Sequence, residues 1–347
     1  MRIILTLLII LTSIEAVAAL EKEMSFRVGS ACDGNGSICA PRIYAEGVIQ
    51  LNTIDIFNSF FQKNKNELPE TPIVSFDSIG GNLVGGMKLG KAIRQLNLDT
   101  QLVGQQHCAS ACSLAFLGGV RRTFEEEGVL GIHRFYSTQG NIGDDTTQVA
   151  IVLIANYIQS MDVDRKLLDI ASLVPADDIL WLSPEQLQAL NIDNTNPKIS
   201  EWRIDTLENG VPFVKTTISL YSNRLQADYI VLPSGNDLIL KIIFTASPHI
   251  IEKFESFMST SDNVYIYADD MNEPIFKSDI NWQLSDNNTK AITSVKLPRS
   301  FITEIPEQGN LTTGFSGNKF ALDLAYYFSF KASLFKNYLK TIAEGNR

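Results

Sequence analysis

Positive charge is scarce in this chain of 347 residues. Lysine and arginine total 29 against 39 aspartates and glutamates, which leaves a formal net charge of −10 at pH 7. Proteins that bind the phosphate backbone of nucleic acids need a surplus of lysine and arginine on one face. No basic stripe with interleaved aromatic residues occurs, so we expect no nucleic-acid partner.

Long apolar runs are also scarce. The run over residues 3–14 is short of the roughly 20 residues that span a bilayer as a helix. Arg2 precedes it and the small residues 16–19 follow it, which is the pattern of a secretory signal peptide over residues 1–19. An uncleaved anchor is the alternative interpretation, and Glu15 disfavours it. We expect a periplasmic or secreted protein with no stable membrane span after cleavage.

The chain has only four cysteines, arranged as two close pairs. Cys32 and Cys39 flank a glycine-containing loop, and Cys108 and Cys112 lie on either side of Ser110. In an exported protein, locally paired cysteines predict disulfides, although a bridge around Ser110 requires a distorted helix start. Neither pair has the second histidine- or cysteine-rich half of a zinc site, so we expect no metal. A phosphate-binding loop is also absent, and we expect no cofactor.

Strand-like and helix-like segments alternate between residues 42 and 194. The expected strands are 43–51, 72–78, 100–104 and 128–132. The expected helices begin at residues 53 and 110 or cover 83–96, 148–161 and 163–171, and a capping box lies at 183–186. This alternation favours a parallel sheet with right-handed crossovers, in which functional groups gather beyond the carboxyl ends of the strands.

The pattern changes to a period of two from Trp202 onward. Strands are expected over 213–220, 228–232, 238–245, 264–268 and 291–297, with a final amphipathic helix over 331–343. The polar stretch 193–197 is interpreted as a linker. We therefore predict an N-terminal segment at 20–41, an α/β domain at 42–196 and a mainly antiparallel β domain at 197–347. Asp269, Asp270 and Asp286 lack calcium-binding spacing and are interpreted as a solvated acidic surface.

Three predicted strand ends carry residues that suit acyl transfer. Such chemistry needs a nucleophile, a base and backbone donors for the oxyanion. Gly80-Gly81, Ser110 and His133 each follow a different strand. The plainer interpretations are a tight turn, a helix cap and a structural histidine. The other histidines, His107 and His249, are less well placed to act as the base.

These segments resemble Clp-type serine proteases. Ser78-Ile79-Gly80-Gly81 is similar to the family's Ser-Pro-Gly-Gly segment, and Gly104 to Ser110 is similar to its Gly-Gln-Ala-Ala-Ser stretch. Gly131-Ile132-His133 resembles the Met-Ile-His segment of the triad histidine, and residues 181–193 resemble the Leu-Ser-Ala-Pro-Glu run that follows. Ile79 replaces the family's proline, and the cysteines beside Ser110 have no counterpart in the cytosolic proteases.

The resemblance implies a ClpP/crotonase-like fold over 42–196 and a set of site residues. Ser110 would be the nucleophile and His133 the general base. The backbone N–H groups of Gly81, or Gly80, and Ala111 would form the oxyanion hole. For the third triad member, alignment at the proline selects Asp178; Asp177 is one residue off, Asp164 is more distant, and a solvated helix start without a triad aspartate is the alternative.

The function expected from the resemblance is an ATP-independent, extracytoplasmic serine endopeptidase that cleaves peptides or flexible protein segments through an acyl-enzyme. The alternative is a catalytically inactive ClpP-like binding module in an envelope protein complex. A further alternative makes Cys108 the nucleophile, which an oxidising compartment disfavours. An acyl-CoA enzyme is disfavoured because coenzyme A is cytosolic. A homo-oligomer is expected by resemblance, and the β domain is expected to dock a substrate or partner.

Overall fold

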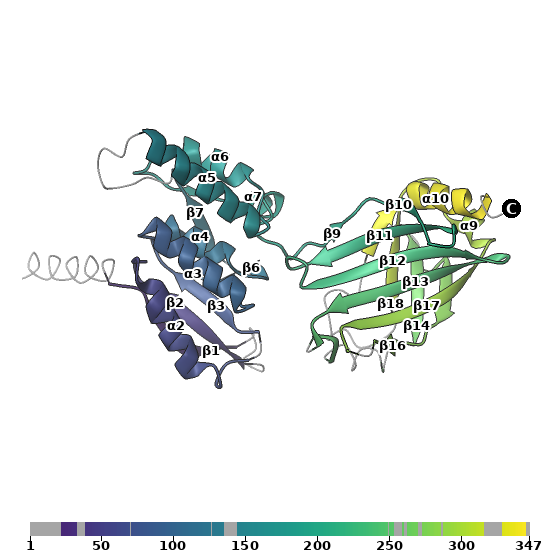
Figure 1. The fold of residues 1–347 in the computed structure, drawn as a ribbon, viewed down its shortest axis with the longest axis horizontal. Coiled ribbons are helices and arrows are strands. Elements are labelled where there is room, and N and C mark those ends of the chain that lie inside the picture. The colour runs from purple at the N-terminus through teal and green to yellow at the C-terminus, as the bar shows by residue number, and fades with distance from the viewer. Residues whose placement is uncertain are drawn as a thin grey trace, which may run out of the picture. The chain divides into compact units, whose positions relative to one another are not determined.

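The chain divides into two compact units, Met1–Asn196 and Pro197–Arg347, drawn in Figure 1. The computed structural model describes residues 22–32, 39–69, 71–125, 127–134, 144–248, 250–252, 259, 262–269, 273–285, 287–315 and 328–344. The predicted signal peptide, His249, Asp270, Asp286 and the side chains of Cys32 and Cys39 lie outside the described residues. No helix within those ranges is long and apolar enough to cross a membrane.

The first unit contains a five-stranded sheet of order β1-β2-β3-β4-β6. Its strands are β1 (Ser25–Cys32), β2 (Cys39–Glu46), β3 (Ile73–Asp77), β4 (Asp99–Leu102) and β6 (Arg122–Phe124). Strands β2, β3, β4 and β6 run parallel, as the alternation of strands and helices predicts. Strand β1, which the pattern did not indicate, forms an antiparallel hairpin with β2 and sets Cys32 opposite Cys39.

Helices cover this sheet and continue beyond it. They are α2 (Thr53–Asn64), α3 (Leu83–Gln95), α4 (Ala111–Leu117), α5 (Asp144–Ser160), α6 (Lys166–Leu173) and α7 (Pro184–Ala189). Figure 1 shows α2, α3 and α4 lying across one face of the sheet. Helices α3 and α4 meet at two glycines, because a Cβ on Gly118 would lie 2.1 Å from the Gly90 carbonyl oxygen. The predicted capping box of Ser183 and Gln186 starts α7.

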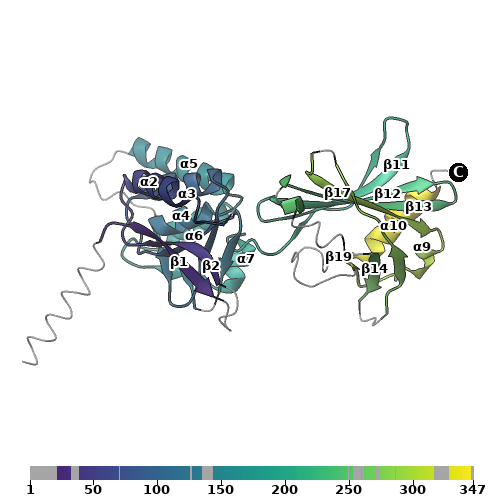
Figure 2. The same ribbon diagram turned by 90° about the horizontal axis from the view of Figure 1, so that it is seen from below.

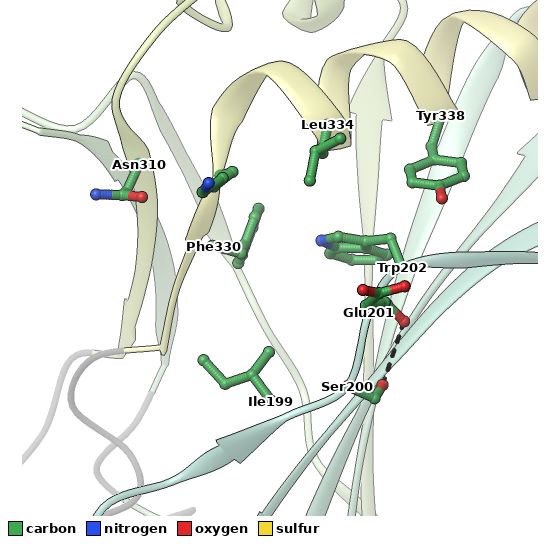
Figure 3. Close-up of a pocket in the computed structure, with 9 residues that line it drawn as sticks. Ile199, Ser200, Glu201, Trp202, Asn310, Phe330, Leu334 and Tyr338 are labelled. Atoms are coloured by element: carbon green, nitrogen blue, oxygen red, sulfur yellow. Dashed lines mark hydrogen bonds between the residues drawn. The ribbon is translucent and has the colours of Figure 1, made fainter. Parts of the chain in front are cut away.

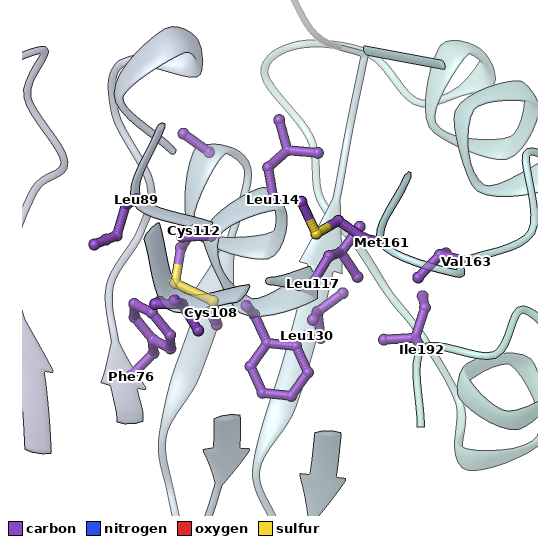
Figure 4. Close-up of a cluster of buried hydrophobic side chains, with 14 of the residues drawn as sticks. Phe76, Leu89, Cys108, Cys112, Leu114, Leu117, Leu130, Met161, Val163 and Ile192 are labelled. Atoms are coloured by element: carbon purple, nitrogen blue, oxygen red, sulfur yellow. A yellow bond between two sulfur atoms is a disulfide. The ribbon is translucent and has the colours of Figure 1, made fainter. Parts of the chain in front are cut away.

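A smaller sheet of order β5-β7-β8 lies beside the first one. Strand β5 (His107–Ala109) is parallel to β7 (Val129–Ile132), and β8 (Leu180–Trp181) is antiparallel to β7. A single parallel bridge between Ser78 and Cys108 connects the end of β3 to β5. The ends of β3, β5 and β7 therefore lie next to one another. Buried apolar side chains pack around this junction (Figure 4).

The side chain of Arg122 in β6 bonds to the last residues of the first unit. The side chain is fully buried, and it donates to the carbonyl oxygens of Ile192 and Gly119 at 2.8 Å and of Asn191 at 2.7 Å. Burial lowers its pKa to about 9, so the guanidinium stays protonated at neutral pH. Asn194 accepts from the backbone N–H of Arg122 at 2.8 Å and is itself buried. The stretch 193–197, interpreted as a linker, contains the boundary between the two units, although Asn194 within it is buried in the first unit.

The second unit is built from antiparallel strands, as the period of two predicts. One sheet contains β9 (Lys198–Ile199), β10 (Arg203–Thr206), β11 (Pro212–Leu220), β12 (Leu225–Ser234), β13 (Asp237–Ala246), β16 (Gln283–Leu284) and β17 (Lys290–Pro298). The other contains β14 (Asn263–Ala268), β15 (Phe276–Asp279), β18 (Asn310–Phe315) and β19 (Phe328–Lys331). Among the described residues, helices α9 (Phe301–Glu304) and α10 (Ala332–Glu344) accompany them.

A single hydrophobic core joins these two sheets and α10. Figure 2 shows β11, β12, β13 and β17 as one layer, with β14, β19, α9 and α10 beneath it. The long strands alternate buried and partly exposed residues, so each contributes one apolar face to the core. From α10, Phe335, Leu339 and Ile342 are buried, at the helical spacing of an amphipathic helix.

Candidate active site

Ser110 stands at the sharp turn between β5 and α4. It is the N-cap residue of α4, as predicted, with φ 56° and ψ −123°. A positive φ is uncommon for a residue with a Cβ, and such conformations cost about 1–3 kcal/mol. Ala109 and Ala111 on either side are buried, whereas Ser110 is partly exposed. The turn therefore presents one hydroxyl between two small buried residues.

Backbone hydrogen bonds from two other strand ends hold this turn. Ser78 donates its N–H to the His107 carbonyl at 2.8 Å, and Ala109 donates to the Ser78 carbonyl at 3.0 Å. On the other side, Ser110 donates its N–H to the Gly131 carbonyl at 3.1 Å. The hydroxyl of Ser113 also donates to the Gly131 carbonyl, at 2.6 Å, and Ser113 is buried. Ser113 is thus engaged in structure, and Ser110 is the exposed serine of this turn.

A disulfide connects Cys108 to Cys112 across the turn, with an S–S distance of 2.02 Å. The predicted bridge around Ser110 is confirmed. Both cysteines are fully buried, and Figure 4 shows them between Phe76 and Leu130. The alternative with Cys108 as nucleophile is wrong for this structure, because the sulfur is already bonded and has no exposed surface.

The glycine pair after β3 lies directly against the Ser110 turn. Gly80 and Gly81 have φ values of +104° and +133°. A Cβ on Gly80 would lie 2.7 Å from the Cβ of Ser110 and 3.0 Å from the N of Ala111, so a larger residue does not fit. The N–H of Gly80 donates to the Ser78 hydroxyl at 3.1 Å. Within the described residues the N–H groups of Gly81 and Ala111 have no acceptor, so these two are the donors available to a ligand.

His133 follows β7, the strand next to β5. The register pairs Ala109 with Gly131, so the chain leaves both strands at the same edge, one at Ser110 and one at His133. The Nδ1 atom of His133 is buried and has no hydrogen-bond partner. No hydrogen bond joins the hydroxyl of Ser110 to His133 in the described part of the chain. The two residues share a strand edge but are not bonded.

Of the candidate aspartates, Asp177 and Asp178 are exposed and Asp164 is partly exposed. The register of β7 and β8 pairs Ile132 with Leu180, which brings the segment around Asp178 beside the residues that follow Ile132. The Oδ1 atom of Asp178, however, accepts from the N–H of Ile179 at 2.8 Å. Asp164 accepts from the N–H of Lys166, the first residue of α6, at 2.9 Å. Among the described residues, no carboxylate bonds to His133, and the third triad member remains a prediction.

The remaining polar residues near the site have structural contacts. His107 is exposed, its backbone N–H donates to Asp77 Oδ1 at 3.3 Å, and its ring meets Trp181 edge-on at 5.7 Å between centroids. No cluster of three histidine, cysteine, aspartate or glutamate side chains that could hold a metal ion occurs in the described ranges. The chemistry available at this edge is therefore that of a hydroxyl, an imidazole and backbone N–H groups.

No protein-family model and no curated protein sequence matches the chain. Several solved structures are similar to part of it. One is a mutant of ClpP1 from Listeria monocytogenes, at 15% identity over 42% of this chain and 85% of that chain, with a TM-score of 0.32. Another is the 1510-N membrane protease specific for a stomatin homolog from Pyrococcus horikoshii, at 20% identity over 43% and 69%, with a TM-score of 0.31. A mutant of a 1510-N membrane-bound stomatin-specific protease matches at 20% identity over 44% and 75%, with a TM-score of 0.35.

Ser78 is a site residue to which the sequence patterns assigned no role. Its hydroxyl accepts from Gly80, its N–H and carbonyl pair with β5, and it is buried. Because the Ser78 hydroxyl accepts from the N–H of Gly80, the N–H of Gly81 is the second available donor beside that of Ala111. The signal was present in the sequence, since Ser78 opens the Ser-Ile-Gly-Gly segment, but only the fold shows what the hydroxyl contacts.

Proposed function

We propose that the first unit is an ATP-independent serine endopeptidase of ClpP/crotonase-like type that works outside the cytoplasm and cleaves peptides or flexible protein segments. The observation that carries the proposal is the conformation of Ser110. Ser110 has a positive φ and is partly exposed, and Gly80 of the glycine pair lies against its turn, which supports the proposal. Backbone strain of this kind concentrates at functional sites, where the surrounding structure imposes it.

In the proposed reaction, Ser110 Oγ attacks the scissile carbonyl carbon while His133 takes the hydroxyl proton. The new carbon–oxygen bond places negative charge on the former carbonyl oxygen, and the N–H groups of Gly81 and Ala111 stabilise it. His133 then delivers its proton to the leaving amine as the carbon–nitrogen bond breaks. Water, activated by His133, releases the acyl group and restores the Ser110 hydroxyl.

We assign Asp178 as the group that orients His133. The buried Nδ1 of His133 lacks a partner, and residues 174–180, which include Asp178, lie beside the end of β7, between the Ile132–Leu180 pair and the bond from Arg134 N–H to the Val174 carbonyl. Asp178 Oδ1 accepts from the N–H of Ile179, so Oδ2 is the oxygen that would accept from Nδ1. Catalytic hydrogen bonds are often long or unformed before substrate binds. Asp177 remains the neighbouring alternative.

Labelling with a fluorophosphonate probe tests the assignment, because the probe reacts with activated serines. We expect the mature protein to be labelled, Ser110→Ala to be unlabelled, and His133→Ala to react about 10²–10⁴-fold more slowly. Ser59→Ala, at an exposed helical serine, is the matched control and should react like the wild type. A folded wild-type protein that fails to react would refute the peptidase.

A catalytically inactive ClpP-like binding module is the second candidate. It is favoured by the missing hydrogen bond between Ser110 and His133 and by the engagement of Asp178 with its own neighbour. This candidate predicts that folded protein binds an envelope partner without reacting with the probe. The labelling experiment therefore separates the two functions.

Export is part of the proposal. It is supported by the signal-like residues 1–19 and by the buried disulfide, since disulfides form and persist in oxidising compartments. Cell fractionation followed by mass spectrometry of the N-terminus should recover a periplasmic or secreted chain that begins near residue 20. Recovery of a cytosolic chain that retains residues 1–19 would contradict it.

We also propose that the protein forms a homo-oligomer through α5. Val149, Val152 and Leu153 occupy one side of this helix, and each is more than half exposed. An apolar patch of this kind on a soluble unit is typical of a protein–protein interface. Sedimentation velocity should show an assembly that Val152→Glu dissociates, whereas a monomeric wild-type protein would contradict the proposal.

A further inference from the structure

The second unit contains a cavity of about 490 Å³. The residues that line it come from the start of the unit, from β18 and β19, and from α10: Ile199, Ser200, Glu201, Trp202, Asn310, Phe330, Lys331, Leu334 and Tyr338. Its volume lies within the range of about 300–1,000 Å³ that ligand sites occupy. Figure 3 shows Phe330 and Trp202 on opposite sides of it, Leu334 above and Ile199 below.

A break in the edge strand creates this cavity. Strands β9 and β10 both pair with β11, and residues 200–202 interrupt the ladder between them. At the break, Ser200 accepts from the hydroxyl of Thr216 at 2.7 Å and from the N–H of Thr217 at 2.9 Å. The chain then turns Trp202 into the core, where its ring packs against Phe330 and Phe335 at 5.3 and 4.8 Å between centroids.

The indole nitrogen of Trp202 makes no hydrogen bond within the fold. The side chain is only 7% exposed, and its Nε1 is buried without a hydrogen-bond partner. In Figure 3 the nitrogen-bearing edge of the ring faces the space between Phe330, Leu334 and Ile199. A buried indole N–H normally finds an acceptor, so this donor indicates an occupant that brings one.

Apolar side chains and two side chains of opposite charge surround the mouth of the cavity. Ile199 is 42% exposed and Leu334 50% exposed. Glu201 and Lys331 are both exposed members of the lining. A carboxylate ligand would meet Glu201, and an ammonium ligand would meet Lys331 and leave the Trp202 donor unsatisfied. A neutral, dipolar occupant complements both charges, and the peptide group is such an occupant.

Two strand edges border the cavity and favour an extended peptide over a lipid tail. Ile199 of β9 and Phe330 and Lys331 of β19 line the cavity, and within the described residues no strand pairs with the outer edge of β9 or of β19. Unpaired edge groups can bond an added extended segment. We propose that this cavity binds an extended polypeptide segment, with one aromatic or large aliphatic side chain inside it and a backbone carbonyl on the indole N–H of Trp202.

The proposal does not rest on the peptidase, and its test uses full-length mature protein without reference to Ser110. The probe is N-acetyl-Ala-Phe-Ala-amide, and N-acetyl-Ala-Ser-Ala-amide is the matched peptide without the apolar side chain. The readout is the NMR resonance of the indole N–H of Trp202, which Trp202→Phe identifies by its loss. We expect the phenylalanine peptide to shift this resonance saturably and to bind at least tenfold more tightly than the serine peptide.

Variants at the cavity and away from it complete the experiment. Leu334→Ser, at the exposed mouth, should weaken the phenylalanine peptide about three- to tenfold, and Trp202→Phe about two- to tenfold because one hydrogen bond is lost. Leu284→Ser is the matched control, since Leu284 is an exposed leucine of the same unit outside the lining, and it should bind like the wild type. Because Leu334 is exposed, its variant tests the site even if Trp202→Phe does not fold.

Three outcomes would overturn the proposal. Equal affinity for the two peptides would show that the cavity does not take the apolar side chain. An unshifted Trp202 resonance at saturating peptide would show that the indole is not in the site. A Trp202 shift with decanoate but not with the phenylalanine peptide would identify a lipid occupant instead.

Discussion

Ser110 holds a backbone conformation that serine adopts only under constraint. The constraint comes from separate parts of the chain: the Ser78–Cys108 bridge, the carbonyl of Gly131 and the disulfide of Cys108 and Cys112. All three contacts act on Ser110 or on residues within two positions of it. In this way the first unit maintains the strain at Ser110 without a ligand.

Replacing Gly80 by alanine tests how closely it packs against the Ser110 turn, because the change adds a single carbon atom. A Cβ on Gly80 would meet the Ala109 carbonyl at 2.6 Å, whereas Gly210, which also has a positive φ of +83°, has nothing within 4 Å. We expect Gly210→Ala to lower the free energy of unfolding by about 1–2 kcal/mol through its φ alone. Gly80→Ala should cost about 1–3 kcal/mol more because of the overpacking.

Guanidinium unfolding measures both variants, and fluorophosphonate labelling supplies the functional readout. Gly80→Ala should lose labelling even where it is folded, because the Ser110 turn has to move, while Gly210→Ala keeps it. Equal unfolding costs together with retained labelling in both variants would mean that Gly80 does not shape the turn.

The residue types at the site were predictable from the sequence, but their contacts were not. Strand ends followed by a glycine pair, a serine and a histidine are visible in the pattern, and Ser110 does start a helix as predicted. The positive φ of Ser110 is not visible, because it results from contacts that are distant in sequence. The use of the Gly80 N–H by Ser78 and the engagement of Asp178 with Ile179 are contacts between near neighbours in sequence, but they depend on side-chain conformations that the sequence pattern does not specify.

At the scale of elements, the sequence predicted the strands in which buried and exposed residues alternate over several turns of the pattern. The central strands β11, β12, β13, β14 and β17 alternate apolar and polar residues over their length and were all predicted. The two-residue strands β9 and β16 and the fully exposed β10 were missed, because a short or solvated strand carries no apolar period. Strand β9, which borders the Trp202 cavity, belongs to this missed class.

Helix α10 brings a buried ammonium into the core of the second unit, and the ammonium makes stability depend on pH. Lys336 Nζ donates to the Ile305 carbonyl and to Glu307 Oε1, each at 2.7 Å. The hydrogen bond from Lys336, and then its charge, lower the pKa of the Glu307 carboxyl from its ordinary value. A carboxyl with a depressed folded pKa adds stability above its unfolded pKa, and that stability is lost as pH falls through the folded pKa.

We therefore expect the Tm of Glu307→Gln to lie below that of the wild type at pH 7, and the difference to shrink as pH falls from about 5 to 3. The buried Lys336 ammonium loses its counter-charge in this variant at every pH. Differential scanning fluorimetry across this range measures the effect. Glu304→Gln, at an exposed glutamate of α9, is the control and should track the wild type. A difference that stays constant down to pH 3 would contradict the assignment to Glu307.

At the scale of the whole molecule, the two units have separate hydrophobic cores. Units with their own cores can fold alone. We expect residues 20–196 and residues 197–347, expressed separately, to fold with cooperative urea unfolding. Trp181 is the sole tryptophan of the first unit, so its fluorescence reports that unit without a label.

A chain that stops at residue 190 is the sharper comparison. It lacks Asn191, Ile192 and Asn194, which bind Arg122, and it leaves a buried guanidinium short of acceptors. We expect a loss of about 3–5 kcal/mol relative to residues 20–196. Similar unfolding midpoints for the two fragments would show that residues 191–196 are dispensable.

The contacts of Arg122 also set the order in which the chain can mature during synthesis. The backbone N–H of Arg122 bonds to Asn194, which is translated 72 residues later. Until residues 191–194 are made, the strands of the first unit lack the segment that bonds to the buried Arg122. Their apolar faces can then contact other chains. The first unit cannot complete its fold before its last residues emerge. This delay keeps the chain unfolded for longer, which suits the proposed export by a machinery that transports unfolded chains.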